Sequence, residues 1–543
     1  MSWRCVGSAN KEGKCVMATA DYWADSPIDR GSNWFSVLFP TLDSLIHPED
    51  PVRLVDDILR QVDWSLWEGE YPRRKGQPPI HPQHIAAATL YGMYRGIRSS
   101  RKLEEACNYR FDFVWLVEGR HIDHTTFNKF RTKFRQPLKD LFRQIGRIAM
   151  TLGLIRLADV AFDGTRVKAN NSRFQTRTAK TLEEKLQALD EFFEQRMSQL
   201  HDADGMGEGA SQLPDELAEV DQRRQRVQAA LEQARAADEA RRRKGVDPQK
   251  NPAQVPTTDP DSRVMPNKEG GYAPNYTPVA TTDGERGFIV DCDVLSEVNE
   301  GSAALPSVDR IEETFGQRPE RFLTDAGNNS GQIMAGMEAR NVEFYAPAES
   351  NQPQAGNPAL REDPRVAVPE CQWPELPRND QGQLDKSCFV YVESEDQYYC
   401  PQGHAMPFEK TKPDERGGEV IQNRIYRCAA CPGCPLAAAC LSPKSKHGRT
   451  ITRDPYEKVR ERTAARMSRE SSRQLYNQRP RMAETTFGIM KSVMGLRQFL
   501  LRGLEKVKTE WLWAATAFNV MKLSREIGKM RAEFAELAAS TEI

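Results

Sequence analysis

The 543-residue sequence has no long apolar run, and no stretch approaches the ~20 apolar residues of a membrane-spanning helix. Its first residues, MSWRCVGSANKEGK, lack the apolar segment of a secretory signal, so we expect a cytoplasmic protein. Apolar residues still make up 39% of the chain, which excludes a wholly disordered protein. At this length the chain is too long for one ordinary core, and we expect two to four domains.

The sequence also has almost no net charge: 76 Lys and Arg against 77 Asp and Glu leave a formal charge of −1. Only the distribution of charge can therefore indicate a partner. Residues 442–508 hold 17 Lys and Arg but six Asp and Glu, a local excess that is typical of DNA-binding surfaces. A second basic group is expected on N-terminal helices, at Arg95, Arg98, Arg101, Lys129, Arg131 and Lys133. The alternative for both groups is an ordinary solvated surface.

Cysteine is scarce outside one segment: five of the eleven cysteines lie within residues 400–440. The spacing is Cys428-x2-Cys431-x2-Cys434-x5-Cys440, with Cys400 and His404 upstream. In a chain without a secretory signal, such crowding favours metal ligation over disulfides, and thiolates on short turns suit a tetrahedral Zn²⁺ site. Four thiolate ligands leave no coordination position on the zinc for a substrate or water, so we expect a structural site. The spacing does not decide which four of the five cysteines bind. No role is assigned to the remaining cysteines, Cys5, Cys15, Cys107, Cys292, Cys371 and Cys388.

The order of the predicted elements is helices, then strands interleaved with helices, then helices again. Apolar spacing indicates short helices from residue 39 to about 152, and a strand near 157–164. Residues 181–244 are rich in Glu, Lys, Gln, Ala and Leu and predict a solvated helical hairpin. Further strands are expected at 276–283, 287–295, 321–325 and 342–345, and helices at 455–537.

Three acidic residues stand at the ends of predicted core elements or on a helix far downstream. Asp163 and Asp325 each end a predicted strand, and Glu484 lies on a helix that begins near Pro480. Carboxylates in such positions can hold Mg²⁺, because hard cations prefer oxygen ligands, and a metal pair can clamp a phosphodiester. Taken singly, an Asp at the end of a strand more often caps a turn than binds a metal. Other acidic residues that could serve as metal ligands instead are Asp159, Asp291 and Asp293.

The helix that carries Glu484 has two distinct faces. Met482, Thr486, Ile489, Val493, Leu496 and Leu500 form a mostly apolar stripe. Glu484 and Lys491 are seven residues apart and share another face, with Gly488 between them. An acid and a lysine on one face suit a metal-bound phosphate, and a solvated salt-bridging face is the alternative.

Several motifs, in this order, resemble bacterial insertion-sequence DDE transposases over roughly residues 30–525. They are Phe39-Pro-Thr-Leu-Asp-Ser-Leu-Ile, Trp115-Leu, His121-Ile-Asp-His-Thr-Thr-Phe-Asn-Lys-Phe-Arg131, Phe162-Asp-Gly-Thr, Leu323-Thr-Asp-Ala-Gly-Asn-Asn-Ser, Tyr476-x-x-Arg479-x-x-x-x-Glu484-Thr-Thr-Phe-Gly-x-x-Lys491 and Arg502-Gly-Leu-Glu-Lys-Val-Lys. The resemblance implies an RNase H-like core whose catalytic and Mg²⁺-binding (or Mn²⁺-binding) acids are Asp163, Asp325 and Glu484. It assigns DNA contacts to Tyr476, Arg479 and Lys491. The gap between Arg479 and Glu484 is one residue longer than the family pattern, so Arg481 is the alternative to Arg479.

The same resemblance implies a zinc-ribbon-like insertion with Cys400, Cys431, Cys434 and Cys440 as zinc ligands, and Cys428 as the alternative ligand. It also implies that N-terminal helices, through residues such as Arg101, Lys129 and Arg131, read the terminal inverted repeats of the element. Because two ends must be joined in one complex, we expect a homodimer on DNA, and a protein associated with the nucleoid.

The predicted fold is a mixture of α+β and α/β, in which an all-α DNA-binding region precedes an RNase H-like core. The expected parts are a flexible arm (1–37), a helical DNA-binding domain (38–152), the core (153–180, 246–350 and 455–530), a helical-hairpin insertion (181–245) and a zinc module (386–452). The predicted function is cleavage at the element's ends and transfer of the 3′-OH to target DNA. The alternatives are a catalytically silent DNA-binding regulator descended from a transposase, and a metal-dependent nuclease without strand transfer.

Overall fold

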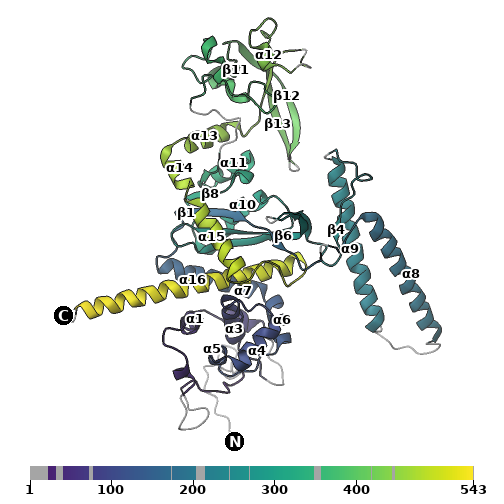
Figure 1. Ribbon diagram of the computed structural model, residues 1–543, viewed down its shortest axis with the longest axis vertical. Helices are drawn as coiled ribbons and strands as arrows, with labels where there is room; N and C mark the ends of the chain where they lie inside the picture. Colours follow the sequence, from purple (N-terminus) through teal and green to yellow (C-terminus); the bar gives the residue numbers. More distant parts are fainter. Residues whose placement is uncertain are drawn as a thin grey trace, which may run out of the picture. The chain divides into compact units, whose positions relative to one another are not determined.

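The computed structural model describes residues 23–541, except 32–40, 72–77, 173, 204–214, 244, 268–269, 348–355, 417–418, 443–444 and 446. Most of the predicted N-terminal arm thus lies outside the described residues. The chain divides into two compact units, which are described separately (Figure 1). The first unit comprises residues 1–156, 164–298 and 484–543, and the second comprises 157–163 and 299–483. No helix among the described residues is long and apolar enough to span a membrane.

Among the described residues, the first unit begins with a 3-10 helix, η2 (Asp43–Leu45), and seven α-helices, in the region for which short helices were predicted. The α-helices are α1 (Pro51–Arg60), α2 (Ser65–Gly69), α3 (Pro82–Tyr94), α4 (Ser100–Tyr109), α5 (Phe111–Leu116), α6 (His124–Lys133) and α7 (Arg135–Thr151). The local sequence explains where several of these helices begin. Proline occupies the first turn of α1 and α3, and the Asp123 carboxylate caps α6 by accepting from the Thr125 and Thr126 amides.

Six antiparallel strands and a helical hairpin make up the described middle part of the first unit. Strands β2 (Val167–Lys168), β5 (Arg263–Pro266) and β7 (Ile289–Leu295) each pair with β6 (Tyr272–Asp283), and β3 (Thr176–Arg177) pairs with β4 (Val255–Pro256). Helices α8 (Ala179–Ala203) and α9 (Asp215–Arg243) occupy the stretch for which a hairpin was predicted. They pack through a small core of their own, which includes Leu182, Val227 and Leu231.

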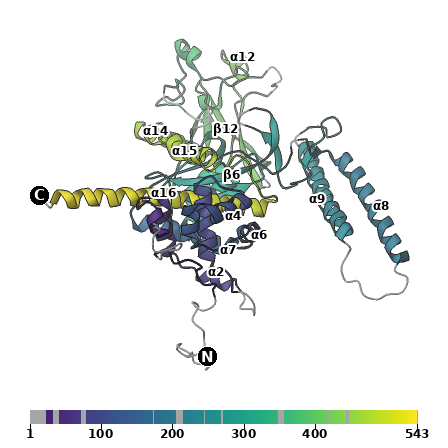
Figure 2. The same cartoon turned by 60° about the horizontal axis from the view of Figure 1, so that its bottom comes forward.

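Helix α16 (Leu504–Thr541) holds the first unit together. It packs against α1, α3, α6 and α7 on the N-terminal side and against β7 (Figure 2). The Trp511 indole donates to the Val279 carbonyl of β6, and the Trp513 indole donates to the Arg131 carbonyl of α6. This helix was predicted to belong to the catalytic core, whereas its buried half also packs against the N-terminal helices.

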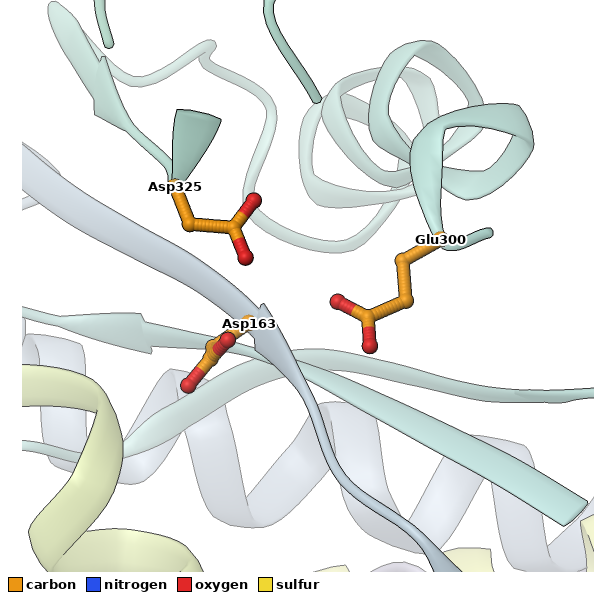
Figure 3. Close-up of side chains that lie close together, drawn as sticks. All are labelled: Asp163, Glu300 and Asp325. Atoms are coloured by element: carbon orange, nitrogen blue, oxygen red, sulfur yellow. The ribbon is translucent and has the colours of Figure 1, made fainter. Parts of the chain in front are cut away.

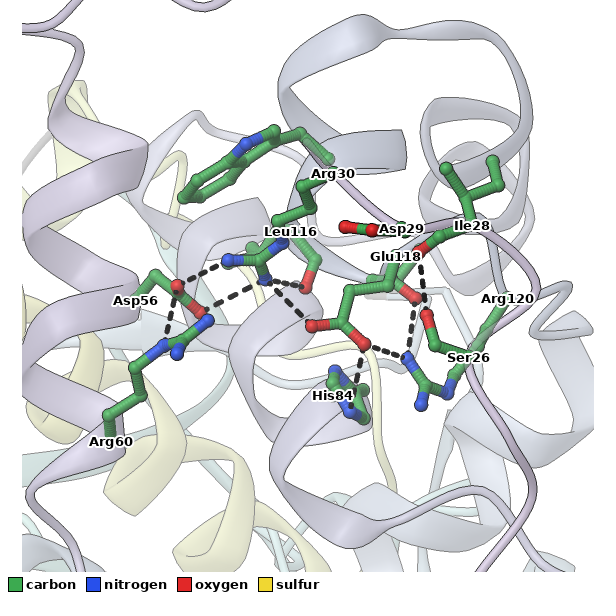
Figure 4. A network of polar contacts seen from close by, with 12 residues as sticks. Ser26, Ile28, Asp29, Arg30, Asp56, Arg60, His84, Leu116, Glu118 and Arg120 are labelled. Atoms are coloured by element: carbon green, nitrogen blue, oxygen red, sulfur yellow. Dashed lines mark hydrogen bonds and ion pairs between the residues drawn. The ribbon is translucent and has the colours of Figure 1, made fainter. Parts of the chain in front are cut away.

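A polar network, shown in Figure 4, anchors residues 26–30 to the N-terminal helices. Arg30 forms an ion pair with Asp56 of α1 at 2.6 Å, and its guanidinium lies 3.9 Å from the ring centre of Trp115. Glu118 accepts from Arg120 at 2.6 Å and lies 4.0 Å from the imidazole of His84. Because His84 is buried beside Arg120, its pKa falls to about 4.

We expect this histidine to make folding of the first unit sensitive to acid. The depressed pKa means that the unfolded state binds the proton better, so stability is fully present above pH ~6.5 and falls as the pH drops toward 4. The loss by pH 4 is about 3 kcal/mol for a shift of this size. Urea unfolding of His84→Gln should show a flatter pH dependence over this window. The exposed His47→Gln serves as the control, and an unchanged slope in His84→Gln would contradict the assignment.

The second unit contains three parallel strands and a separate antiparallel module. Strands β1 (Asp159–Gly164, of which Gly164 belongs to the first unit), β8 (Arg321–Leu323) and β9 (Glu343–Tyr345) are parallel neighbours. Between them run η3 (Gly301–Ala303), α10 (Ala304–Phe315), η4 (Ala326–Asn328) and α11 (Gly331–Ala339). Helices α13 (Glu457–Met467), α14 (Glu470–Tyr476) and the first turn of α15 (Arg479–Ser492) follow the module.

The module is a five-stranded antiparallel sheet in the order β10-β11-β12-β13-β14. Its elements are η5 (Glu370–Glu375), η6 (Lys386–Cys388), β10 (Val390–Val392), η7 (Glu393–Glu395), β11 (Gln397–Tyr399), β12 (Ala405–Arg416), β13 (Glu419–Arg427), α12 (Ala437–Cys440) and β14 (Thr450–Arg453). Its core also includes Ala359, Val368 and Leu376, which lie upstream of the predicted start at residue 386. The prediction missed this part because residues 347–380 are rich in Pro, Asn and Gln and show no periodicity.

Candidate active site and cysteine cluster

Three carboxylates of the second unit lie together at the end of the parallel strands. The register pairs Ala161 of β1 with Leu323 of β8, so Asp163 and Asp325 follow at equivalent positions of adjacent parallel strands. The carboxyl ends of parallel strands meet at one edge of a sheet, which is why these two side chains are neighbours. Glu300, directly before η3, completes the group (Figure 3). Each residue offers an oxygen, and these atoms lie within 4.8 Å of one another.

Nearby side chains hold the two aspartates in place. The Asp325 carboxylate accepts from the Gly327 amide at 3.1 Å and from the Asn328 side chain at 3.0 Å. The Asp163 carboxylate lies 3.0 Å from the guanidinium of Arg479, which is 8% exposed. The Nε of Arg479 is buried and donates to no described residue. One donor of this arginine is therefore not used within the described part of the chain.

Tyr476, on the last turn of α14, also belongs to this neighbourhood. Its hydroxyl donates to the Thr324 carbonyl at 3.1 Å, next to Asp325 in the chain. Burial raises the pKa of Tyr476, and the charges of Asp325 and Asp163 raise it further, while Arg479 lowers it. The structure thus brings together four of the residues predicted from sequence, namely Asp163, Asp325, Tyr476 and Arg479.

The donor set fits a divalent cation. Three carboxylates within 4.8 Å of one another repel, and Arg479 supplies one positive charge against them. Oxygen ligands from Asp and Glu are those that Mg²⁺ and Mn²⁺ prefer. The arrangement can therefore bind a hard cation beside a buried arginine that has a free donor.

Glu300 was missed by the sequence analysis, and Glu484 is not in the group found among the described residues. Glu300 lies in the loop between β7 and α10, where no apolar periodicity marks the position of a side chain. The signal available was its place directly before a helix start, at Glu300-Gly-Ser-Ala-Ala-Leu. Glu484 is exposed on α15 and belongs to the first unit. Its role as the third acid stays a prediction.

The other predicted residues have varied surroundings. Among the rival acids, Asp159 is paired with Arg321 at 2.5 Å and Asp293 with Lys508 at 3.1 Å. Lys491 donates to the Thr165 hydroxyl, within the first unit. Arg101, Lys129 and Arg481 are exposed, and their contacts with DNA stay a prediction. Arg131 differs, because it is only 7% exposed.

The five clustered cysteines line one small cavity of about 20 Å³ in the module, together with His404. Four of them, Cys400, Cys428, Cys431 and Cys440, are buried, and Cys434 is partly buried. The Cys428 thiol donates to the Cys400 sulfur, which lowers the pKa of Cys400 to about 6. Among the described residues, no three sulfurs lie within 4.8 Å of one another, so binding one metal would require small side-chain rotations.

Backbone geometry supports a compact cysteine cluster. Gly448 has φ +84°, and a Cβ added there would lie 2.3 Å from the Cys428 carbonyl oxygen and 3.3 Å from the Cys431 sulfur. The neighbouring Arg449 amide donates to that sulfur at 3.3 Å. Sulfur atoms on short turns, buried and served by backbone donors, match the chemistry of a thiolate zinc site.

Two parts of the chain match known protein families. Residues 40–133 match the family described as Transposase domain (DUF772), and residues 399–524 match the family Transposase DDE domain. No curated protein and no solved structure matches the sequence. The first match covers Arg101, Lys129 and Arg131, and the second covers the cysteine cluster, Tyr476, Arg479, Glu484 and Lys491. The match to an N-terminal transposase domain and the match to a DDE domain together support an insertion-sequence DDE transposase.

Proposed function

We propose that this transposase binds the terminal inverted repeats of its element, cleaves the DNA at the element's ends and joins the freed 3′-OH to target DNA. The observation that carries this proposal is the convergence of Asp163 and Asp325 at the ends of β1 and β8. Glu484 is proposed as the third acid, on the family pattern, within an RNase H-like core. Glu300 is proposed as a further carboxylate beside them.

The carboxylates would hold Mg²⁺ or Mn²⁺. When bound, such ions lower the pKa of an attacking water and stabilise the charge on a phosphoryl group in transfer. Arg479 would contact DNA phosphate beside the acids, because its guanidinium lies 3.0 Å from the Asp163 carboxylate. Tyr476 fixes the backbone next to Asp325 through the Thr324 carbonyl. Lys491 would contact a neighbouring phosphate.

The N-terminal helices and the cysteine cluster would bind DNA and zinc, respectively. Exposed basic residues of the N-terminal helices, Arg101 and Lys129, would contact the inverted repeats. Four cysteines of the module, predicted as Cys400, Cys431, Cys434 and Cys440, would bind one structural Zn²⁺. A homodimer would hold two element ends in one complex on nucleoid DNA.

The test is a strand-cleavage assay on a labelled duplex that carries the element's terminal repeat, with supercoiled plasmid as target. We expect Mg²⁺-dependent cuts at the repeat boundary and joined products in the plasmid. Cuts without joined products would favour a nuclease. Specific binding without cutting, in Mg²⁺ and in Mn²⁺, would favour a regulator.

A further inference from the structure

A cavity in the first unit is separate from the acidic residues and from the cysteine cluster. Its volume is about 210 Å³, and it lies where the start of α4, helix α6 and the segment at the start of α16 meet. Its polar lining comes from Arg98, Ser99, Ser100, Asn128, Arg131 and Glu510. One water needs roughly 10–15 Å³ of such space, so the cavity can hold a polyatomic ion with its waters.

Arg131 is the unusual member of this lining. Its side chain is nine-tenths buried, and only Nη1 is engaged, donating to the Arg98 carbonyl at 2.6 Å. Its Nε and Nη2 are buried and donate to no described residue. A buried charged donor left unpaired destabilises the folded state, so folded proteins rarely leave one without a hydrogen-bond partner.

The start of α4 points to the same kind of ligand. Ser99 is the N-cap residue of this ten-residue helix, and its side chain makes no capping hydrogen bond. The first N–H groups of a helix have no partner within the helix, and the helix dipole places partial positive charge there. Ser99 and Ser100 both line the cavity. The uncapped start of α4 and the buried Arg131 therefore line one cavity.

The single carboxylate in the lining is already neutralised. Glu510 forms an ion pair with Arg98 at 2.6 Å and accepts from the Leu500 and Leu501 amides. Nη1 and Nη2 of Arg98 also donate to the carbonyls of Gly495 and Gln498, each at 2.7 Å, whereas its buried Nε donates to no described residue. Two arginines, Arg98 and Arg131, thus face one carboxylate in this lining, so the cavity keeps a net positive charge.

We propose that this cavity binds a phosphate group, held by Arg131, the start of α4 and the Asn128 amide, and that the phosphate belongs to the DNA backbone. The second part rests on the proposed function, since it assumes that the chain binds DNA. A free phosphate would satisfy the same donors, and the test separates the two sources. The proposal also gives a role to Arg131 despite its burial, because the DNA phosphate would enter the cavity.

The test compares Asn128→Asp with Asn108→Asp in the full-length chain. The first places a negative charge at the cavity, and the second makes the same change at an exposed site near the end of α4. Inorganic phosphate should raise the melting temperature of the wild type and of Asn108→Asp above that in chloride of equal ionic strength, but not that of Asn128→Asp. Ser100→Asp supplies an anion at the helix start, so it should raise the melting temperature without phosphate and remove the phosphate effect.

The second measurement is the salt dependence of binding to a 30-base-pair duplex, without divalent ions. Loss of one phosphate contact should lower the slope of log K against log salt by about 0.9 in Asn128→Asp and leave Asn108→Asp unchanged. A phosphate effect on melting with no change in slope would refute the DNA source and leave a free phosphate as the ligand. No difference between the two variants in either measurement would overturn the proposal. Neither readout requires cleavage, so a failure of the proposed catalysis would be seen separately.

Discussion

Replacing Asp163 or Asp325 by Asn is expected to lower Mg²⁺-dependent cleavage by about 10³-fold or more, while DNA binding is retained. Each substitution removes a negative ligand from a group whose oxygens lie within 4.8 Å of one another. The measurement is the initial rate of cutting on the terminal-repeat duplex, with a gel-shift assay for binding. Asp159→Asn is the matched control, because Asp159 lies on the same strand and is paired with Arg321. Cleavage by Asp163→Asn at the wild-type rate would show that the site lies elsewhere.

The same assay separates the roles of the two glutamates. Glu484→Gln should lose cleavage as fully as the aspartate variants if Glu484 is the third acid. Glu300→Gln should raise the Mg²⁺ concentration needed for half-maximal activity by roughly tenfold, since Glu300 adds a carboxylate to a site that the other acids also form. The opposite ranking, with full loss in Glu300→Gln and little loss in Glu484→Gln, would make Glu300 the third acid.

The sequence predicted the two aspartates because their positions follow from a local rule. Each stands where a short apolar strand ends, and parallel strands bring such ends together. Glu300 obeys no such rule: its place is set by the path of the loop between β7 and α10, and loop paths depend on tertiary contacts. Tyr476 and Arg479 were found through the family pattern, and periodicity alone would not have placed them beside β1 and β8.

The sequence was a poorer guide to which helices pack together. The helical pattern near residue 504 was recognised, but α16 packs against both the N-terminal helices and β7. The contacts that explain this are specific hydrogen bonds: the Asn519 amide exchanges two with the backbone of Ile289, and Trp513 donates to Arg131. Such pairs join residues hundreds of positions apart, and one sequence carries no signal of them. For the same reason, Arg131 was predicted as an exposed basic residue although α16 covers it.

The second large effect is expected from zinc removal. The full-length chain should contain about one equivalent of zinc by mass spectrometry of metals, and a strong chelator should make the module sensitive to protease. A structural site of this kind contributes on the order of 10 kcal/mol to folding, far more than the small core around the cysteines could replace. Cys431→Ser should lose the zinc, because its sulfur lines the shared cavity and accepts from the Arg449 amide.

Single serine substitutions should then show which four of the five cysteines bind. Cys428→Ser is expected to keep the metal, and Cys400→Ser, Cys434→Ser and Cys440→Ser are expected to lose it. The Cys428 thiol contacts the Cys400 sulfur, so Cys428 is the alternative zinc ligand. Loss of zinc in Cys428→Ser together with retention in Cys434→Ser would show that Cys428, and not Cys434, is the fourth ligand. Cys388→Ser is the control, since Cys388 is buried in the same core but its thiol donates to the Pro377 carbonyl at 3.3 Å. If all five variants at the clustered cysteines retained zinc, the metal would be bound elsewhere. The crowding of these cysteines would then not be explained by zinc binding.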